Sequence, residues 1–292
     1  MVRNANGEGT EADYIEFIVD EVVFKTYRAV ISQRRDHARP NRRCILYSFG
    51  QLESSMNEGV EFVQELILRL DDADPEVEHH FVIWDYPGYG KYWRQKQDVS
   101  KTDTEFNALC RYVQGLDPRC PMTDERFVRA ASEAVLKTSL KENPTVPMYL
   151  WGRSIGSYAT CYLLKYAMEN QIEQIKGVIL ISPLQSVISL RFCDLFLDSR
   201  FDILNNHLLV VRPVGRSTLF PVKMIHHERD PIIPITQAVG LQETFQQVGG
   251  YDVSLKKLTD QTEDCHNLMS EYYMKAVCEF LLQQKKCNSG SS

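Results

Sequence analysis

A serine with the neighbours expected of a nucleophile lies in the pentapeptide Gly152-Arg153-Ser154-Ile155-Gly156, which has the pattern G-x-S-x-G. A serine on a sharp turn from strand to helix has strained backbone angles, so small residues must flank it. Such a turn raises the hydroxyl above the sheet. It also directs the next amide N–H groups and the positive end of the helix towards the same point. These features favour attack on a carbonyl carbon.

The residues around this pentapeptide have the periodicity that such a turn needs. Composition alone produces the pattern in roughly one chain of this length in twenty, so the pentapeptide by itself is weak evidence. Before it, residues 148–151 form an apolar run of strand length that follows Pro144 and Pro147. After it, apolar residues recur at helical spacing through Leu164. The sequence therefore predicts a strand, a turn at Ser154 and a helix.

A serine nucleophile needs a base to take its proton and an acid to orient that base. In open α/β sheets these groups collect beyond the carboxyl ends of the strands. Asp230 follows the predicted strand 222–225, and His266 follows the predicted strand 253–258. The order Ser154, Asp230, His266 is the nucleophile–acid–base order of α/β-hydrolases. We therefore expect Asp230 as the acid and His266 as the base.

Each assignment has a plainer alternative. Asp230 could be an ordinary residue of a strand-end turn, and Glu228 competes with it as the acid. His266 could simply begin the last helix. The chain has six other histidines, all less well placed as a base: His37, His79, His80, His207, His226 and His227.

The negatively charged oxygen of an acyl-transfer intermediate needs two preorganised N–H donors. One is expected to be the amide of Ile155, directly after the nucleophile. The other is expected from the loop after the apolar strand 44–49, where the amide of Gln51 follows the flexible Gly50. The alternative for residues 49–51 is a plain turn at the end of that strand.

The elements that position these groups alternate between apolar strands and amphipathic helices, with no internal repeat. This alternation predicts one α/β domain with a mostly parallel central sheet and helices on both faces. The domain is expected over 14–286, beginning with an antiparallel pair within 14–32. Residues 1–13 and 287–292 are expected to be flexible tails. The apolar but irregular segment 184–220 is expected to be a small cap over the site, or else to pack as part of the core.

Composition narrows the class of function. The 292 residues carry a formal charge of −6, whereas nucleic-acid-binding proteins are typically basic, so we expect no nucleic-acid partner. Eight cysteines without a C-x-x-C pair predict reduced thiols and a cytoplasmic protein without structural zinc. No run approaches the ~20 apolar residues of a membrane span. The chemistry predicted calls for no cofactor or metal. Peripheral membrane contact and the oligomeric state stay open.

With these residues assembled, the chain resembles the α/β-hydrolase superfamily, and within it the branch of serine hydrolases that includes the cytosolic-leaflet protein depalmitoylases. Residues 14–284 carry the resemblance. The matching motifs are Phe49-Gly50-Gln51, the segment 85–90 (DYPGYG), the pentapeptide 152–156, Ser182-Pro183-Leu184, the segment 225–230 and Cys265-His266-Asn267.

Three residues depart from that branch: Phe49 replaces a histidine, and His227 and Cys265 replace glycines. These side chains are expected to crowd turns near the site. The first cysteine is Cys44, so we expect the chain to differ from the depalmitoylases in their anchoring N-terminal cysteine segment.

The resemblance implies a serine hydrolase that cleaves an ester or thioester through an acyl-enzyme. The substrate would be a small molecule or an acylated protein, such as a long-chain acyl or palmitoyl-protein thioester. A peptidase of the same fold and a catalytically silent binding module are the two alternatives.

Overall fold

The structure is a computed structural model that describes residues 2–3, 9–19, 21–32, 41–48, 55–84, 125–186, 204–216, 218–260, 266 and 271–288. Its strands are β1 (Val2–Arg3), β2 (Gly9–Val19), β3 (Val22–Ser32), β4 (Asn41–Ser48), β5 (Val77–Trp84), β6 (Met148–Arg153), β7 (Ile175–Ile181), β8 (Phe220–His227) and β9 (Tyr251–Leu258). Its helices are α1 (Ser55–Ala73), α3 (Glu125–Glu142), α4 (Gly156–Glu169), α6 (Ile235–Val248), α7 (Glu271–Asn288) and the short 3₁₀ helix η4 (His207–Leu209).

These strands form one sheet in the order β1-β2-β3-β5-β4-β6-β7-β8-β9. β1, β2 and β3 pair antiparallel, and β3 is antiparallel to β5. From β5 to β9 every neighbouring pair is parallel. The predicted α/β class with a mostly parallel sheet is therefore confirmed.

The antiparallel pair predicted within 14–32 is also confirmed, but the predicted tail at 1–13 is wrong in part. β2 begins at Gly9, and residues 2–3 add a short strand beside it. Asp13 lies directly opposite Arg28 in the β2–β3 register, and the two side chains form an ion pair. At the other end, α7 extends to Asn288, two residues into the predicted C-terminal tail.

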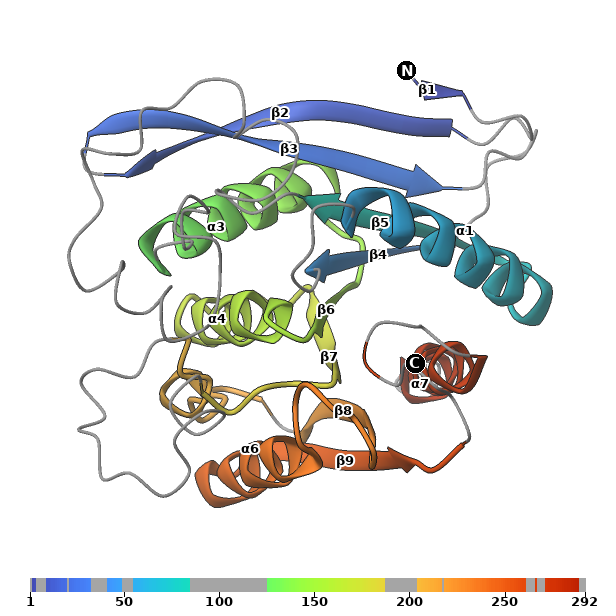
Figure 1. Ribbon diagram of the computed structural model, residues 1–292. Coiled ribbons are helices and arrows are strands. Elements are labelled where there is room, and N and C mark those ends of the chain that lie inside the picture. The colour runs from blue at the N-terminus through green and yellow to red at the C-terminus, as the bar shows by residue number, and fades with distance from the viewer. Residues whose placement is uncertain are drawn as a thin grey trace.

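Helices cover both faces of the sheet, with α3, α4 and α6 on one face and α1 and α7 on the other (Figure 1). Side chains alternate between the two faces along each strand. In β4, Cys44 and Leu46 pack with the α4 side, whereas Ile45 and Tyr47 pack with the α1 and α7 side. Strands buried on both faces have nearly continuous apolar sequences, which explains the apolar runs.

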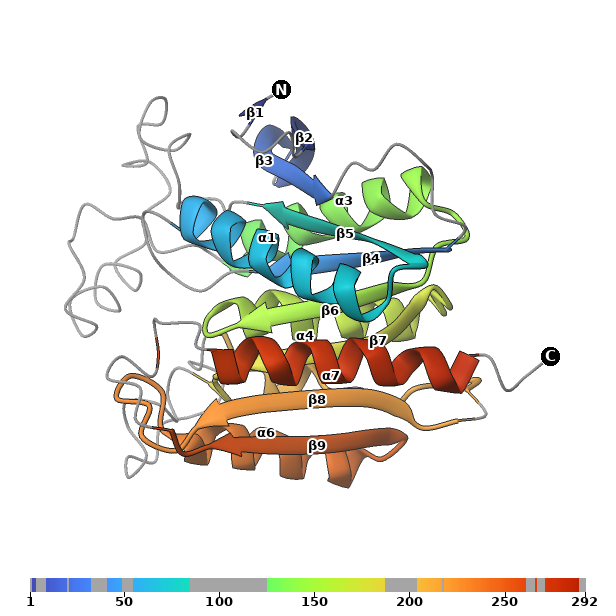
Figure 2. The same ribbon diagram turned by 90° about the vertical axis from the view of Figure 1, so that its right-hand side faces the viewer.

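The parallel strands bring the expected site residues to one edge of the sheet. β6, β8 and β9 end on the same side of the molecule (Figure 2). Ser154 directly follows β6, and Asp230 follows β8 by three residues. His266 comes eight residues after the end of β9.

The flanks of the predicted cap 184–220 pack on the α4 face of the sheet. Leu184, Leu204, Leu209 and Val210 are buried in the same core cluster as α4. Residues 187–203, the middle of the segment, lie outside the described residues. The cap therefore stays a prediction, while its two ends form part of the core. In the described part of the chain, no helix is long and apolar enough to cross a membrane.

Candidate active site

The turn at Ser154 has the strained backbone that the G-x-S-x-G pattern predicts. Ser154 has a φ of 53°, in the left-handed region that L-residues rarely adopt. Its amide donates to the carbonyl of Ile181 on the neighbouring strand, at 2.9 Å. A Cβ on Gly152 would lie 2.5 Å from Thr160 Oγ1 and 2.7 Å from the carbonyl oxygen of Gly156. Only glycine fits at position 152.

Helix α4 begins immediately after the strained serine. Ile155 has helical angles, and its carbonyl accepts the amide of Tyr158 at 3.0 Å. The amide of Ser157 donates to the carbonyl of Ser154 at 2.9 Å. Ile155 therefore lies where the helix begins, as its predicted oxyanion role requires. Gln51, the other predicted donor, lies outside the described residues, and both roles stay predictions.

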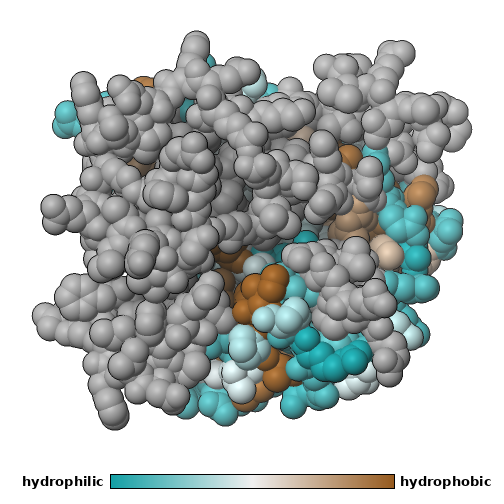
Figure 3. Space-filling view, viewed as in Figure 1, coloured by the Kyte–Doolittle hydropathy of each residue, from teal (hydrophilic) through white to brown (hydrophobic). Residues whose placement is uncertain are grey.

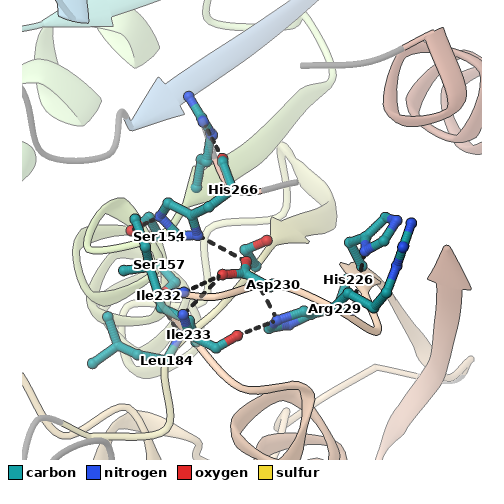
Figure 4. Close-up of polar contacts among 12 residues, drawn as sticks. Ser154, Ser157, Leu184, His226, Arg229, Asp230, Ile232, Ile233 and His266 are labelled. Carbon is teal, nitrogen blue, oxygen red and sulfur yellow. Dashed lines mark hydrogen bonds and ion pairs between the residues drawn. The ribbon is translucent and has the colours of Figure 1, made fainter. Parts of the chain in front are cut away.

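Ser154, His266 and Asp230 form a hydrogen-bonded chain (Figure 4). His266 Nε2 lies 3.1 Å from Ser154 Oγ, and His266 Nδ1 lies 2.7 Å from Asp230 Oδ2. The three residues are 8%, 7% and 7% exposed. The three side chains selected from the sequence thus meet in a nearly buried site, although 112 residues separate the serine from the histidine.

Both carboxylate oxygens of Asp230 are occupied. Oδ2 accepts from His266, and Oδ1 accepts from the amides of Ile232 and Ile233, each at 2.9 Å. Burial on its own would raise the pKa of Asp230, but the hydrogen bonds from His266 and the two amides lower that pKa to about 2. Asp230 is therefore ionised at neutral pH. The competing residue Glu228 is exposed, although its amide donates to the carbonyl of Leu258.

His226 lies on the other side of Asp230 and was not assigned a role from the sequence. Its Nε2 is 2.8 Å from the carbonyl oxygen of Ile233 and 3.6 Å from Asp230 Oδ2. Burial lowers the pKa of His226, so the imidazole is neutral at pH 7. Its N–H therefore holds the turn that supplies the Ile233 amide to the carboxylate. Only its position at the end of the Asp230 strand hinted at such a role.

Two further contacts hold the backbone around the site. Arg153 Nη2 donates to the carbonyl oxygen of His266 itself, linking the nucleophile turn to the base. Ser157, the second residue of α4, is bonded through its Oγ to Asn206 Nδ2 at 3.0 Å, and Asn206 Nδ2 also donates to the Leu184 carbonyl. The pentapeptide pattern left position 153 open, and nothing in the sequence linked Ser157 to Asn206.

The remaining histidines have other surroundings. His79 and His80 lie on β5, away from the carboxyl ends of β6 and β8, and His207 Nδ1 is bonded to Thr244 Oγ1 at 2.6 Å. His37 lies outside the described residues. Within the described ranges, no three His, Cys, Asp or Glu side chains form a group that could hold a metal ion.

Comparison with known proteins gives structural relatives only. No family model matches the chain, and no curated protein matches it. Among solved structures, a cold-adapted esterase from an Arctic intertidal metagenomic library is 17% identical with a TM-score of 0.54, covering 97% of this chain and 99% of its own.

Two Pyrococcus proteins have similar scores. An esterase from Pyrococcus furiosus is 15% identical with a TM-score of 0.56, covering 94% of this chain and 92% of its own. An acylaminoacyl peptidase from Pyrococcus horikoshii is 13% identical with a TM-score of 0.54, covering 94% of this chain but 41% of its own. At these identities the likeness concerns the fold, and together with the sheet order it shows that the chain has the α/β-hydrolase fold.

Proposed function

We propose that the chain is a serine hydrolase that cleaves carboxylic esters or thioesters through an acyl-enzyme formed on Ser154. The observation that carries this proposal is the hydrogen-bonded chain from Ser154 through His266 to Asp230, placed at a strained strand-to-helix turn. A serine that merely stabilised the fold would need neither the left-handed backbone nor a histidine whose other nitrogen faces a buried carboxylate.

The hydrogen bonds determine the direction of proton transfer. An ionised Asp230 only accepts hydrogen bonds, so His266 Nδ1 carries the proton and Nε2 is left as an acceptor for the Ser154 hydroxyl. As Ser154 Oγ bonds to the substrate carbonyl carbon, its proton moves to His266 Nε2. His266 then gives this proton to the leaving alcohol or thiol as the C–O or C–S bond breaks.

Water completes the cycle. It attacks the acyl-enzyme while His266 Nε2 takes its proton, and that proton returns to Ser154 Oγ as the acid product leaves. Asp230 stabilises the imidazolium in both halves of the cycle. The amides of Ile155 and Gln51 would bind the oxyanion, which is the role that their sequence positions predict.

Apolar residues adjoin the residues that form the site. Ile232, whose amide bonds to Asp230, is 50% exposed, and Leu184 lies beside Ser157 on the first turn of α4 (Figure 4). The side of the molecule seen in Figure 3 carries apolar patches among hydrophilic ones. The proposal extends to a long-chain acyl group, such as the palmitoyl thioester implied by the resemblance. The proposed location is the cytoplasm, with peripheral membrane contact where the substrate is membrane-bound.

The proposal is tested with a fluorophosphonate probe on the wild type and on Ser154→Ala. We expect covalent labelling of the wild type alone, because only an activated serine reacts at a useful rate. If neither protein is labelled, the chain would instead be a catalytically silent binding module. Equal labelling of both would place the reactive group elsewhere.

A second experiment separates the substrate classes. We expect p-nitrophenyl esters to be hydrolysed with a preference for longer acyl chains, and aminoacyl p-nitroanilides to be poor substrates. A preference for the anilides would favour a peptidase, as the Pyrococcus horikoshii acylaminoacyl peptidase is named. A matched acyl thioester then tests whether sulfur leaving groups are accepted.

A further inference from the structure

His227, the last residue of β8, is buried and has both ring nitrogens bonded. The amide of Arg229 lies 3.0 Å from His227 Nδ1, and His227 Nε2 lies 3.0 Å from the carbonyl oxygen of Asp260. The resembled branch has glycine at this position, so neither contact could form there. The imidazole at this position is therefore a feature of this chain that the resembled branch lacks.

The two contacts determine the tautomer of His227. A backbone amide can only donate, so Nδ1 must accept and carries no proton. In the neutral ring the proton is then on Nε2, which can donate to the Asp260 carbonyl. Protonation of Nδ1 would remove the contact with Arg229.

These contacts connect the acid and the base. On the acid side, the carbonyl of His227 accepts the amide of Asp230 at 3.1 Å, and its ring accepts the amide of the preceding residue, Arg229. On the base side, His227 binds the Asp260 carbonyl, six residues before His266. Arg153 holds the carbonyl of His266. Two described residues on the base side, Asp260 and His266, are thus each bonded through their backbone carbonyl to a side chain beside the site.

We propose that His227 is a positioning residue that sets the distance between Asp230 and His266. This inference rests on the proposed function, because it assigns His227 to the alignment of that same site. His227 touches neither substrate nor the reacting atoms. Its effect comes from joining the end of β8, which bears the acid, to the segment after β9, which bears the base.

The two ring nitrogens can be separated by substitution. In His227→Gln, the side-chain N–H₂ can reach the position of Nε2 and keep the bond to the Asp260 carbonyl. In His227→Asn, the shorter side chain can place its oxygen near Nδ1 and keep only the Arg229 contact. Because the Arg229 amide lies in a turn that the Asp230 amide already closes, we expect the Asp260 bond to be the important one.

The experiment measures the rate of fluorophosphonate inactivation, the kcat and KM on a p-nitrophenyl ester, and the low-field proton NMR signal of the His266 Nδ1–H. We expect His227→Gln to keep the signal and react within about threefold of the wild type. For His227→Asn we expect a broadened or shifted signal and a kcat lower by about 10- to 100-fold with little change in KM, because small misplacements at a reacting centre have effects of this size.

Controls separate positioning from general stability. His79 is a buried strand histidine on β5, so His79→Gln and His79→Asn measure the cost of the same substitutions far from the site. Arg229 Nη2 also donates to the Asp260 carbonyl but belongs to an exposed residue, so Arg229→Ala should lower kcat by less than His227→Asn.

Several outcomes would overturn the inference. Equal wild-type rates and signals in both His227 variants would do so, as would a folded His227→Gln variant that loses the signal and most of its activity. If His227→Asn does not fold, the comparison of His227→Gln with the wild type still decides the question. A wild type that is not labelled refutes the proposed function instead, whereas a labelled wild type with unaffected variants refutes only the role of His227.

Discussion

Replacing Asp230 with asparagine tests the geometry of the site most directly, because the structure determines how the new amide must lie. Asp230 Oδ1 accepts two backbone amides at 2.9 Å each. An asparagine N–H₂ group cannot replace that oxygen, since it would place donor against donor. The asparagine oxygen therefore stays at Oδ1, and its N–H₂ group takes the position of Oδ2, 2.7 Å from His266 Nδ1.

This orientation reverses the tautomer of the base. Facing an N–H₂ donor, His266 Nδ1 must accept, and the ring proton moves to Nε2. Nε2 then points its proton at Ser154 Oγ and can no longer act as the base. The same change in a serine protease triad lowers kcat by about 10⁴, which corresponds to a barrier about 5.5 kcal/mol higher. We expect a loss of this order.

The assay is kcat/KM on a p-nitrophenyl ester, with circular dichroism to show that Asp230→Asn is folded. Glu228→Gln is the matched control, because it removes the charge of an exposed carboxylate in the same turn. Its activity should stay within about twofold of the wild type. Folded Asp230→Asn with unchanged turnover would refute the assignment, and a large loss in Glu228→Gln instead would transfer the acid role to Glu228.

Three further expectations concern stability. Gly152→Ala should lower the free energy of unfolding by about 3 kcal/mol or more in urea titrations, because the added methyl overlaps Thr160; an unchanged midpoint would refute the tight turn. The pKa of Asp230 falls from 3.8 to about 2 on folding, so its stabilisation, about 2 kcal/mol, is present above pH 4 and disappears as the pH falls through 2. The stability difference between wild type and Asp230→Asn should therefore shrink in acid, and a constant difference would contradict this. Arg28→Met removes the buried guanidinium that binds two carboxylates and should lower stability by about 1–3 kcal/mol without slowing the probe reaction; slower labelling of folded protein would contradict that separation.

The sequence could predict the three polar residues because each depends on a local pattern. An apolar run of strand length predicts a buried strand, and the carboxyl ends of parallel strands meet at one edge. Ser154, Asp230 and His266 could therefore be placed together without knowledge of their neighbours. The position of β5 between β3 and β4 could not be read in this way, because no residue of the local pattern encodes the order of strands.

The prediction of a flexible tail over residues 1–13 was wrong in part for a physical reason. The residues 9–13 (GTEAD) are polar, which is typical of a flexible tail. They pair antiparallel with β3, however, and residues 9 and 10 also pair with β1. Antiparallel strands can leave a polar face in solvent. Asp13 faces Arg28, whose guanidinium also reaches Glu142 on α3, so the charged end of the strand is tied to the domain.

The contacts around the site could also not be predicted from the sequence. His226 and His227 are adjacent in the chain, but in a strand adjacent side chains point to opposite faces. One ring supports the turn of Asp230, and the other reaches the carbonyl of Asp260. Their different roles follow from this alternation. Their hydrogen-bond partners, however, lie in turns that no short sequence pattern predicts.

His227 also bears on the alternative of a silent fold, because a bulky residue at a glycine position was expected to crowd the site. That expectation is wrong for this residue. Near the site, the left-handed backbone that favours glycine is found at Ser154 and Ser182, whereas His227 continues the strand. Its imidazole makes two hydrogen bonds and lies within bonding distance of the acid turn and the base segment. A departure that would have counted against catalysis therefore becomes a reason to expect a well-aligned acid and base.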